Sequence, residues 1–409
     1  MSGPHDDLHL PDALAAIRAA AAVIGPHIRH TPTVYSFTFS ESAGCDVYLK
    51  LENLQRTGSF KIRGALHKLL TMDPERRARG LIAASAGNHA QGVALAARIC
   101  HAPATIVMPE NTALIKVQRT EGYGAEVLLH GANYDAAQRH ATALAAERSL
   151  TLVHPFDDRS IIDGQGTLAL EILAEVPEVD TIVVPVGGGG LIAGIALAVK
   201  ALAPRVRVIG VQAEGAAPTV QSFHRGERVS VESPRTIAEG IRVGSPGRTT
   251  FGIIRALVDD CVTVTEDEIT EAVVQTMEKS KLVAEAAGAV AIAALLSGRV
   301  RSEGRLCAVV SGGNIDLNLL SRLIESGLSR AGRTHLVKLR VPDVPGQLSA
   351  VIGLIAESRA NVLDVQHYRS GWKVPIGSVD IEILLETRHA DHGAEVERAL
   401  SAHGFDVHA

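Results

Sequence analysis

The stretch TGSFKIRGA, from Thr57 to Ala65, places one lysine, Lys61, among apolar residues. A lysine amine that loses its water becomes neutral more easily, and it can then form a Schiff base with a carbonyl compound. The alternative is a solvated lysine at the start of a helix that Ser59 caps. This stretch alone does not decide between the two, so the other candidate residues must.

Four consecutive glycines, Gly187 to Gly190, stand between an apolar run and the segment LIAG. Without Cβ atoms the backbone can approach an anion and direct several N–H groups at it, and a following helix adds its positive end. The run therefore predicts a phosphate cradle, with a tight packing turn as the alternative. No Gly-Lys-Ser/Thr follows, which excludes a P-loop of the nucleotide triphosphatase type.

The same run also fits a dinucleotide fingerprint. Gly188, Gly190 and Ala193 match the spacing G-x-G-x-x-A, and Glu214 ends the next apolar run, where a ribose contact is expected. A nicotinamide enzyme would leave the stretch around Lys61 and two further turns without a role.

Those two turns are SAGNHAQG, from Ser85 to Gly92, and VSGGN, from Val310 to Asn314. The N–H groups of the first turn can hold a small anion such as a carboxylate, and the second turn offers the hydroxyl of Ser311. Plain capping explains both turns as well: Ser85 and Asn88 can cap a helix, and Ser311 can lie in the N-cap region of the helix after it. His89 taken alone is typical of a structural histidine.

Together these segments supply one lysine, one phosphate cradle, one carboxylate-sized nest and one hydroxyl. Pyridoxal phosphate with an amino-acid substrate needs this set. Lys61 would form the Schiff base, the glycines would hold the phosphate, and the nest would hold the substrate carboxylate. The Ser311 hydroxyl would meet the pyridine nitrogen.

The elements that must position these groups repeat from about residue 80. Short apolar runs such as GLIAA, DTIVVPV and RLCAVVS lead through a Gly-rich turn into an alanine-rich helical segment. This alternation predicts an α/β fold with a parallel sheet and helices on both faces. Ligands in such folds bind beyond the C-terminal ends of the strands, where the turns lie.

The pattern changes after residue 328. Residues 329–333 form a basic, small-residue linker, and residues 334–409 have the pattern of strand, helix, strand, strand, helix, strand. That order predicts a separate ferredoxin-like βαββαβ domain of α+β type.

The composition of this 409-residue chain argues against two classes of binding partner, nucleic acids and membranes. The net charge is -5, aromatic residues are 3%, and no basic block occurs, which argues against nucleic-acid binding. Four widely spaced cysteines lack metal-ligand spacing and favour an intracellular protein. The N-terminal MSGPHDDLHL has no secretory pattern and no apolar run reaches spanning length, so we expect a cytoplasmic protein without a membrane partner.

The chain resembles the threonine dehydratase (threonine ammonia-lyase) family, of the tryptophan-synthase-β-like class of pyridoxal phosphate enzymes. The resemblance spans residues 10–328 and rests on seven motifs in family order: TPTVYS, VYLKLENLQRTGSFKIRGA, SAGNHAQG, GGGGLIAG, TIAEGI, AEAAGA and SGGN. It implies a two-lobed catalytic domain over residues 1–328, with the smaller lobe at about 50–155.

The resemblance also implies roles for single residues. Lys61 carries the cofactor, Phe60 flanks its ring, Asn88 bonds its phenolic oxygen, Ser311 meets the ring nitrogen, and Glu285 approaches the ring. The phosphate is held by Gly187, Gly188, Gly189, Gly190 and Leu191. The substrate carboxylate faces Ser85, Ala86, Gly87, Asn88 and His89.

Residues 334–409 resemble an ACT domain, a regulatory module that binds amino acids, with DVPGQL at Asp343 to Leu348 as its signature. One module per chain implies pairing between subunits in a homodimer or homotetramer. Isoleucine is the first candidate effector and valine the second, and a biosynthetic or catabolic role stays open.

The implied reaction is β-elimination of L-threonine, and of L-serine, to 2-ketobutyrate or pyruvate and ammonia. Serine racemases of this fold carry a serine where Ala86 stands, so racemisation is expected to be minor. Elimination from 3-hydroxyaspartate, β-replacement, and a role as a catalytically weak amino-acid sensor stay open. We expect no metal near Glu214, because Pro218 and Val220 stand where a further carboxylate would be needed.

Overall fold

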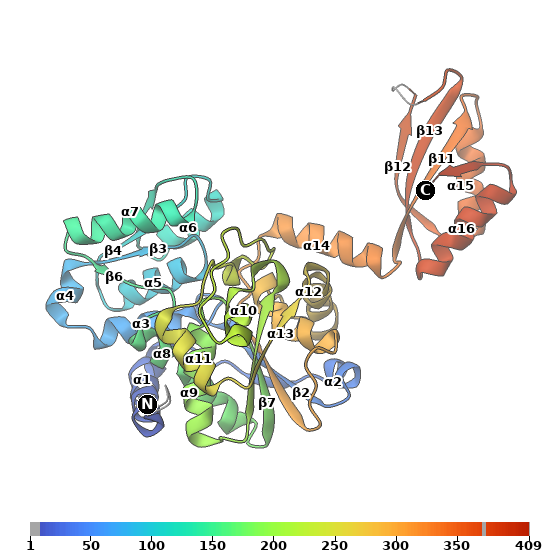
Figure 1. The fold of residues 1–409 in the computed structure, drawn as a ribbon. Coiled ribbons are helices and arrows are strands. Elements are labelled where there is room, and N and C mark those ends of the chain that lie inside the picture. The colour runs from blue at the N-terminus through green and yellow to red at the C-terminus, as the bar shows by residue number, and fades with distance from the viewer. Residues whose placement is uncertain (1–8, 370–373, 409) are drawn as a thin grey trace. The chain divides into compact units, whose positions relative to one another are not determined.

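The computed structural model of the chain describes residues 9–369 and 374–408. The chain divides into two compact units, Met1–Asp316 and Leu317–Ala409 (Figure 1). Residues 1–8, 370–373 and 409 fall within the expected domains 1–328 and 334–409 but lie outside the described residues.

The first unit is built on a six-stranded sheet with the order β1-β2-β10-β7-β8-β9. Within this order the neighbouring strands β2, β10, β7, β8 and β9 all pair in parallel, as the sequence predicts. In this sheet the edge strand β1 alone pairs antiparallel, with β2. Strand β10 lies between β2 and β7. The strands are β1 (Thr33–Tyr35), β2 (Asp46–Leu51), β7 (Val179–Pro185), β8 (Arg207–Ala213), β9 (Asp260–Val264) and β10 (Arg305–Val310).

Both faces of this sheet are buried. Ile182 and Val184 pack with α9 (Gly190–Leu202) in one apolar cluster, whereas Val183 between them is equally buried and belongs to the other face. Helix α13 (Ala286–Leu296) packs against β7, β8, β9 and β10. Helices α1 (Leu10–Ile24) and α8 (Arg159–Glu175) pack against α9 and against each other.

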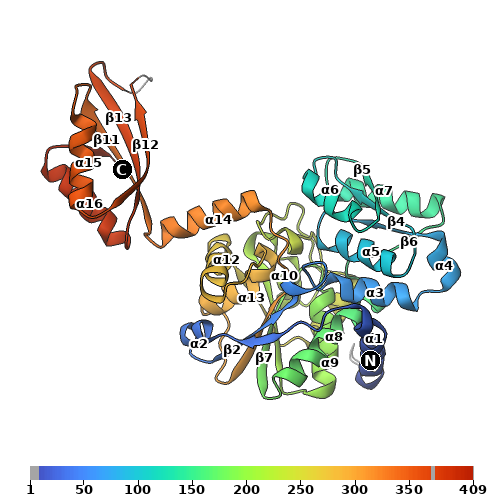
Figure 2. The ribbon, with the colours of Figure 1, turned by 180° about the vertical axis from the view of Figure 1, so that it is seen from behind.

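The smaller lobe of this unit holds a four-stranded parallel sheet with the order β5-β4-β3-β6 (Figure 2). Its strands are β3 (Leu81–Ala84), β4 (Ala104–Met108), β5 (Glu126–Leu129) and β6 (Thr151–Leu152). Its helices are α3 (Lys61–Thr71), α4 (Pro74–Arg79), α5 (Asn88–Ile99), α6 (Leu114–Glu121) and α7 (Tyr134–Glu147). The chain crosses between the lobes at residues 52–60 and again at residues 153–158.

The remaining helices of the first unit surround the large sheet. They are α2 (Phe37–Ala43), α10 (Pro218–Arg225), α11 (Arg248–Leu257) and α12 (Glu266–Ser280), with the 3-10 turns η1 (Gly25–His27), η2 (Glu52–Leu54), η3 (Glu214–Ala216) and η4 (Glu239–Ile241).

The second unit begins with α14 (Leu317–Arg330) and continues as strand, helix, strand, strand, helix, strand, the order that the sequence pattern predicts. Its antiparallel sheet has the order β12-β13-β11-β14. The elements are β11 (Thr334–Pro342), α15 (Gln347–Glu357), β12 (Asn361–Tyr368), β13 (Ser378–Glu386), α16 (Ala390–Ala402) and β14 (Asp406–His408).

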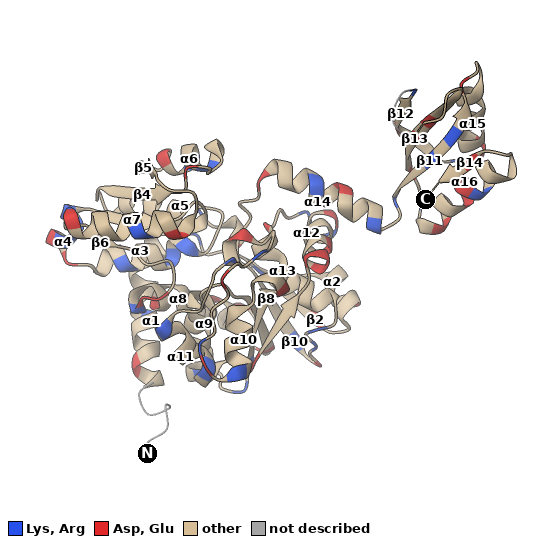
Figure 3. Cartoon of the chain, turned by 45° about the horizontal axis from the view of Figure 1, so that its top comes forward, with Lys and Arg blue, Asp and Glu red and all other residues tan. Residues whose placement is uncertain are grey.

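Charged residues of both signs occur along the helices of each unit (Figure 3). Over the described ranges, none of the helices combines the length and the apolar character that crossing a membrane would require.

Candidate active site

Lys61 is the first residue of α3 and stands at the end of the first crossing between the lobes. The residue before the helix is Phe60, and no side chain caps this end. The Ser59 hydroxyl is buried and has no hydrogen-bond partner within residues 9–369 and 374–408, so the interpretation of Ser59 as a cap is wrong. The Lys61 amine instead lies 5.2 Å from the centroid of the Phe60 ring.

The Lys61 amine is held by the second crossing between the lobes. Its Nζ donates a hydrogen bond of 2.9 Å to the backbone carbonyl of Pro155. Loss of water around the amine lowers the pKa of Lys61 to about 8, although the negative charge of Glu285 opposes this. A neutral, nucleophilic amine is therefore accessible near physiological pH, which favours the reactive-amine interpretation over the solvated one.

The loop that carries Pro155 was not predicted from the sequence. The ring nitrogen Nδ1 of His154 accepts hydrogen bonds from the N–H groups of Phe156 (3.3 Å) and Asp157 (2.8 Å). The Asp157 carboxylate accepts from the first N–H groups of α11, at Arg248 and Thr249, each at 2.9 Å. The next residue along the chain, Asp158, caps α8. The two aspartates were the sequence signal that could have predicted an ordered loop here. A backbone carbonyl that accepts from a lysine has no sequence signature.

The glycine run turns its carbonyls into the protein. The carbonyl of Gly187 accepts from the Thr219 hydroxyl at 2.9 Å, and that of Gly188 accepts from the Thr250 hydroxyl at 2.7 Å. The N–H groups of Gly187 to Gly190 have no acceptor in the described part of the chain. They lie at the N-terminus of α9, whose positive end favours an anion. This arrangement suits a phosphate group.

The residue type in this run is also required by packing. A Cβ on Gly188 would lie 2.3 Å from the Phe156 ring, and one on Gly190 would lie 3.0 Å from the Phe156 Cα. Gly189 has a φ of 96°, which disfavours any side chain. Packing thus explains why these residues are glycine, but it does not explain why their N–H groups have no protein acceptor.

The turn from Ser85 to His89 connects β3 to α5. Asn88 is the first residue of α5 and does not cap it, whereas the Ser85 hydroxyl accepts from the Gly87 N–H at 3.2 Å. His89 Nε2 lies 2.9 Å from the Val153 carbonyl, and burial lowers the pKa of His89 to about 3, so the ring is neutral and donates there. Within the described residues, the N–H groups of Ala86, Asn88 and His89 have no acceptor, and they form a nest of carboxylate size.

Ser311 follows β10 and is buried, with 4% of its surface exposed. Helix α14 begins only at Leu317, so the interpretation of Ser311 as part of its N-cap region is wrong. The turn instead pairs with residues 57–60, the lysine loop, which directly precede Lys61. Phe60 N–H donates to the Ser311 carbonyl at 3.2 Å, and Gly313 N–H donates to the Gly58 carbonyl at 2.9 Å.

Glu285 precedes α13 and contacts Asn88. The Asn88 Nδ2 donates to Glu285 Oε1 at 2.5 Å, and burial raises the pKa of Glu285 to about 7. The oxygen of the Asn88 amide is bound by Asn314, whose Nδ2 donates to Asn88 Oδ1 at 2.8 Å. Asn314 belongs to the SGGN motif, but its sequence context predicted no role for it.

The predicted site residues therefore meet at one place, beyond the C-terminal ends of β3, β7 and β10. Gly240 of η4 connects two of the groups: a Cβ there would lie 3.5 Å from Glu285 Oε1 and 3.7 Å from Asn88 Nδ2. Its neighbour Ile241 lies against Gly187. Within the described residues, no three His, Cys, Asp or Glu side chains are grouped so that they could hold a metal, and Glu214 is exposed.

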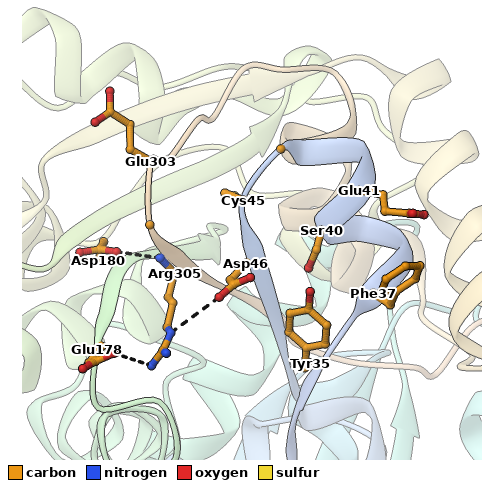
Figure 4. Close-up of a pocket in the computed structure, with 12 residues that line it drawn as sticks. Tyr35, Phe37, Ser40, Glu41, Cys45, Asp46, Glu178, Asp180, Glu303 and Arg305 are labelled. Carbon is orange, nitrogen blue, oxygen red and sulfur yellow. Dashed lines mark hydrogen bonds and ion pairs between the residues drawn. The ribbon is translucent and has the colours of Figure 1, made fainter.

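A separate open pocket of about 730 Å³ lies where strands of the same sheet begin (Figure 4). Arg305, the first residue of β10, pairs there with Glu178 at 2.8 Å and with Asp46 at 3.8 Å. Its N–H donates to Asp180 at 2.7 Å. None of the predicted site residues lines this pocket, so it is not the candidate active site.

Comparisons with known proteins identify the family of the chain. Residues 24–312 match the family model described as pyridoxal-phosphate dependent enzyme. The chain is 46% identical over 394 residues to an L-threonine ammonia-lyase of Thermotoga maritima, which covers 96% of this chain and 98% of that protein.

Solved structures that resemble it in fold include the following two. One is the processed form of threonine deaminase isoform 2 from Solanum lycopersicum, with a TM-score of 0.74, 37% identity, and coverage of 78% of this chain and 94% of that one. The other is maize serine racemase, with a TM-score of 0.73, 36% identity, and coverage of 78% and 98%.

Proposed function

This chain belongs to the family of pyridoxal-phosphate dependent enzymes, and we propose that it is a threonine ammonia-lyase, which converts L-threonine into 2-ketobutyrate and ammonia. L-serine is the expected second substrate and would give pyruvate. The observation that carries the proposal is the 46% identity to a threonine ammonia-lyase over nearly the whole chain. The Lys61 amine, held in the site with a lowered pKa, supports it.

The residues present fit pyridoxal 5′-phosphate. Lys61 would hold it covalently, with the Phe60 ring beside it. The N–H groups of Gly187 to Leu191 would bind the phosphate, because no acceptor in the described part of the protein occupies them and they lie at the start of α9. The Asn88 amide would bond the phenolic oxygen, and the Ser311 hydroxyl would meet the ring nitrogen. Because a serine is neutral, it does not enforce a charged pyridinium.

When bound, pyridoxal phosphate withdraws electrons from the substrate Cα, which makes the α-proton acidic and allows the β-hydroxyl to leave. The N–H groups of the turn from Ser85 to His89 would hold the substrate carboxylate. The Lys61 amine, whose pKa is lowered to about 8 by the loss of water, is positioned by the Pro155 carbonyl and in its neutral form would take the α-proton. The hydroxyl leaves with a proton as water, so that the lost α-proton and the hydroxyl together make one water. Hydrolysis of the released enamine consumes one water and gives the 2-keto acid and ammonia.

Racemisation of serine is the second candidate function, because the fold is similar to that of maize serine racemase. A racemase needs an acid or base on the face of the substrate opposite the lysine. Serine racemases of this fold carry a serine at the position of Ala86, and the methyl group of Ala86 has no proton to transfer. This favours elimination over racemisation.

The second unit supports a proposal about regulation. Residues 334–409 would form an ACT domain that binds an amino acid, with isoleucine as the first candidate and valine as the second. The βαββαβ order supports this, as does the position of the DVPGQL segment, which follows β11 and ends in the first two residues of α15. Strand β12 is an edge strand of this sheet, and its outer backbone edge would pair with a second copy in a homodimer or homotetramer.

The decisive experiment is a substrate panel on the purified enzyme loaded with pyridoxal phosphate. L-threonine, L-serine and 3-hydroxyaspartate are each supplied, and 2-keto acid and ammonia are measured together. We expect equal amounts of 2-ketobutyrate and ammonia from threonine, with a lower kcat/KM for the other two. No keto acid from any of the three would refute the proposal and favour an amino-acid sensor instead.

A further inference from the structure

A chain of hydrogen bonds runs from the lysine loop across the site to the start of α13, through Thr57, Asn314, Asn88 and Glu285. We propose that Asn314 and Glu285 fix the rotation of the Asn88 amide, so that an N–H group and not the carbonyl oxygen faces the cofactor. Asn314 is thereby a positioning residue of the active site. The inference rests on the proposed function only in assuming that Asn88 meets the phenolic oxygen of the cofactor.

The direction of the chain is set by a backbone group. The Thr57 carbonyl can only accept, and Asn314 Nδ2 lies 2.7 Å from it. The reversed Asn314 amide would place its Oδ1 against this carbonyl, and two acceptors would meet. Asn314 must therefore present its NH₂ group, whose second hydrogen goes to Asn88 Oδ1 at 2.8 Å.

The orientation of Asn88 follows from that of Asn314. Its Oδ1 accepts from Asn314, so its NH₂ group lies on the opposite side and donates one hydrogen to Glu285 Oε1 at 2.5 Å. A reversed Asn88 would set Oδ1 against the carboxylate and Nδ2 against Nδ2. One N–H of Asn88 is left, and it has no acceptor in the described part of the chain, so it can serve a phenolic oxygen, which accepts well when ionised.

The Glu285 carboxyl group is itself fixed. Its backbone N–H donates to the Gly312 carbonyl at 3.0 Å. A Cβ on Gly312 would lie 2.3 Å from Glu285 Oε1, and one on Gly240 would lie 3.5 Å from the same atom. The carboxyl group thus lies between two glycine backbones that leave it little freedom to turn away from Asn88.

The test uses Asn314→Asp, which keeps the size of the side chain but cannot donate to either the Thr57 carbonyl or Asn88 Oδ1. Apoenzyme is titrated with pyridoxal phosphate, and the dissociation constant and the visible absorption band of the lysine-bound cofactor are recorded. Loss of a hydrogen bond to a charged group is expected to weaken binding by about 10-fold or more, with a shifted band. Asn314→Ala, which adds no charge, should change both in the same direction.

The matched control is Asn53→Ala. Asn53 also donates an amide hydrogen bond to a backbone carbonyl, that of Val283 at 3.1 Å, and within the described residues it has no hydrogen bond to Asn88. It should bind the cofactor as the wild type does. A loss in this control as large as that in Asn314→Asp would refute the inference.

A double-mutant cycle separates positioning from a general structural role. In an Asn88→Ala background, Asn314→Asp should change the dissociation constant less than about twofold, because the amide that it orients is gone. An equal loss in both backgrounds would overturn the inference. If wild-type protein binds pyridoxal phosphate and Asn314→Asp has the same affinity and spectrum, the inference fails while the proposed function stands. If the wild type does not bind the cofactor, the proposed function itself fails.

Discussion

Glutamine in place of Glu285 cannot ionise, whereas ionisation of the buried Glu285 carboxyl group costs free energy in the folded protein. The glutamine amide oxygen can still accept the hydrogen bond from Asn88. Burial raises the pKa of Glu285 from 4.5 to about 7, against the opposing effects of the Asn88 hydrogen bond and the Lys116 and Lys61 charges; Glu239 adds to the increase. Because the native pKa exceeds the unfolded one, the native state binds more protons between these two values. The stability of the wild-type apoenzyme should therefore fall as the pH rises through this window.

The magnitude follows from the size of the shift. Each unit of pKa corresponds to about 1.4 kcal/mol, and between pH 5 and pH 8 the cost of ionising buried Glu285 grows by about 2.5 kcal/mol. For a catalytic unit of this size, that corresponds to about 4 °C in melting temperature. Glutamine does not ionise, so the melting temperature of Glu285→Gln minus that of the wild type should rise by about 4 °C between pH 5 and pH 8.

Melting of the apoenzyme, followed by circular dichroism at several pH values, measures this difference. Other carboxylates titrate equally in both proteins and cancel. Glu121→Gln, which removes a carboxylate at an exposed position at the end of α6, is measured beside Glu285→Gln as the control. A constant difference for Glu285→Gln would refute the view that this carboxyl group is driven toward its neutral form.

Three further predictions concern the reaction and its control. Lys61→Ala should lose the visible absorption band of the lysine-bound cofactor and lower kcat by at least about 1,000-fold, and normal steady-state rates in this variant would contradict the proposed base. Ala86→Ser should increase D-serine formation relative to pyruvate, measured by chiral chromatography, since it supplies a proton donor in the turn; no gain in D-serine would show that residue 86 does not face the substrate. Truncation after Gly332 keeps all the proposed site residues and should retain activity but lose the response to isoleucine or valine, which typically corresponds to about 1–3 kcal/mol of coupling. Identical responses in full-length and truncated enzyme would remove the regulatory role from residues 334–409.

Much of the architecture could be predicted from the sequence because its signals are local. The alternation of apolar runs, glycine turns and alanine-rich helices predicted parallel pairing, which the structure divides between two sheets. The turns after β3 and β10 meet where Asn314 donates to Asn88. The alternative interpretation of Ser59 and Ser311 as capping residues was wrong, because both residues belong to a pairing between the lysine loop and the turn after β10.

The contacts that complete the site were missed for a physical reason. The partner of Lys61 is a backbone carbonyl at Pro155, 94 residues away in sequence, and any residue type could supply it. The role of Asn314 depends on a contact with Asn88 over 226 residues, which no periodicity encodes. Composition and spacing report which groups exist, whereas these contacts depend on how the two crossings between the lobes come together.

The position of β10 has a consequence for how the enzyme is made. This strand is the last of the large sheet to leave the ribosome, yet it pairs in the interior of that sheet, between β2 and β7. A nascent chain that ends before residue 305 lacks the strand that joins β2 to β7, so the two halves of the sheet cannot dock in their final register. The groups that would receive the cofactor are then also incomplete, because Ser311 and Asn314 follow this strand. Folding of the large lobe is therefore completed only after β10 has been synthesised, and binding of the cofactor reports that this strand and the turn after it are in place.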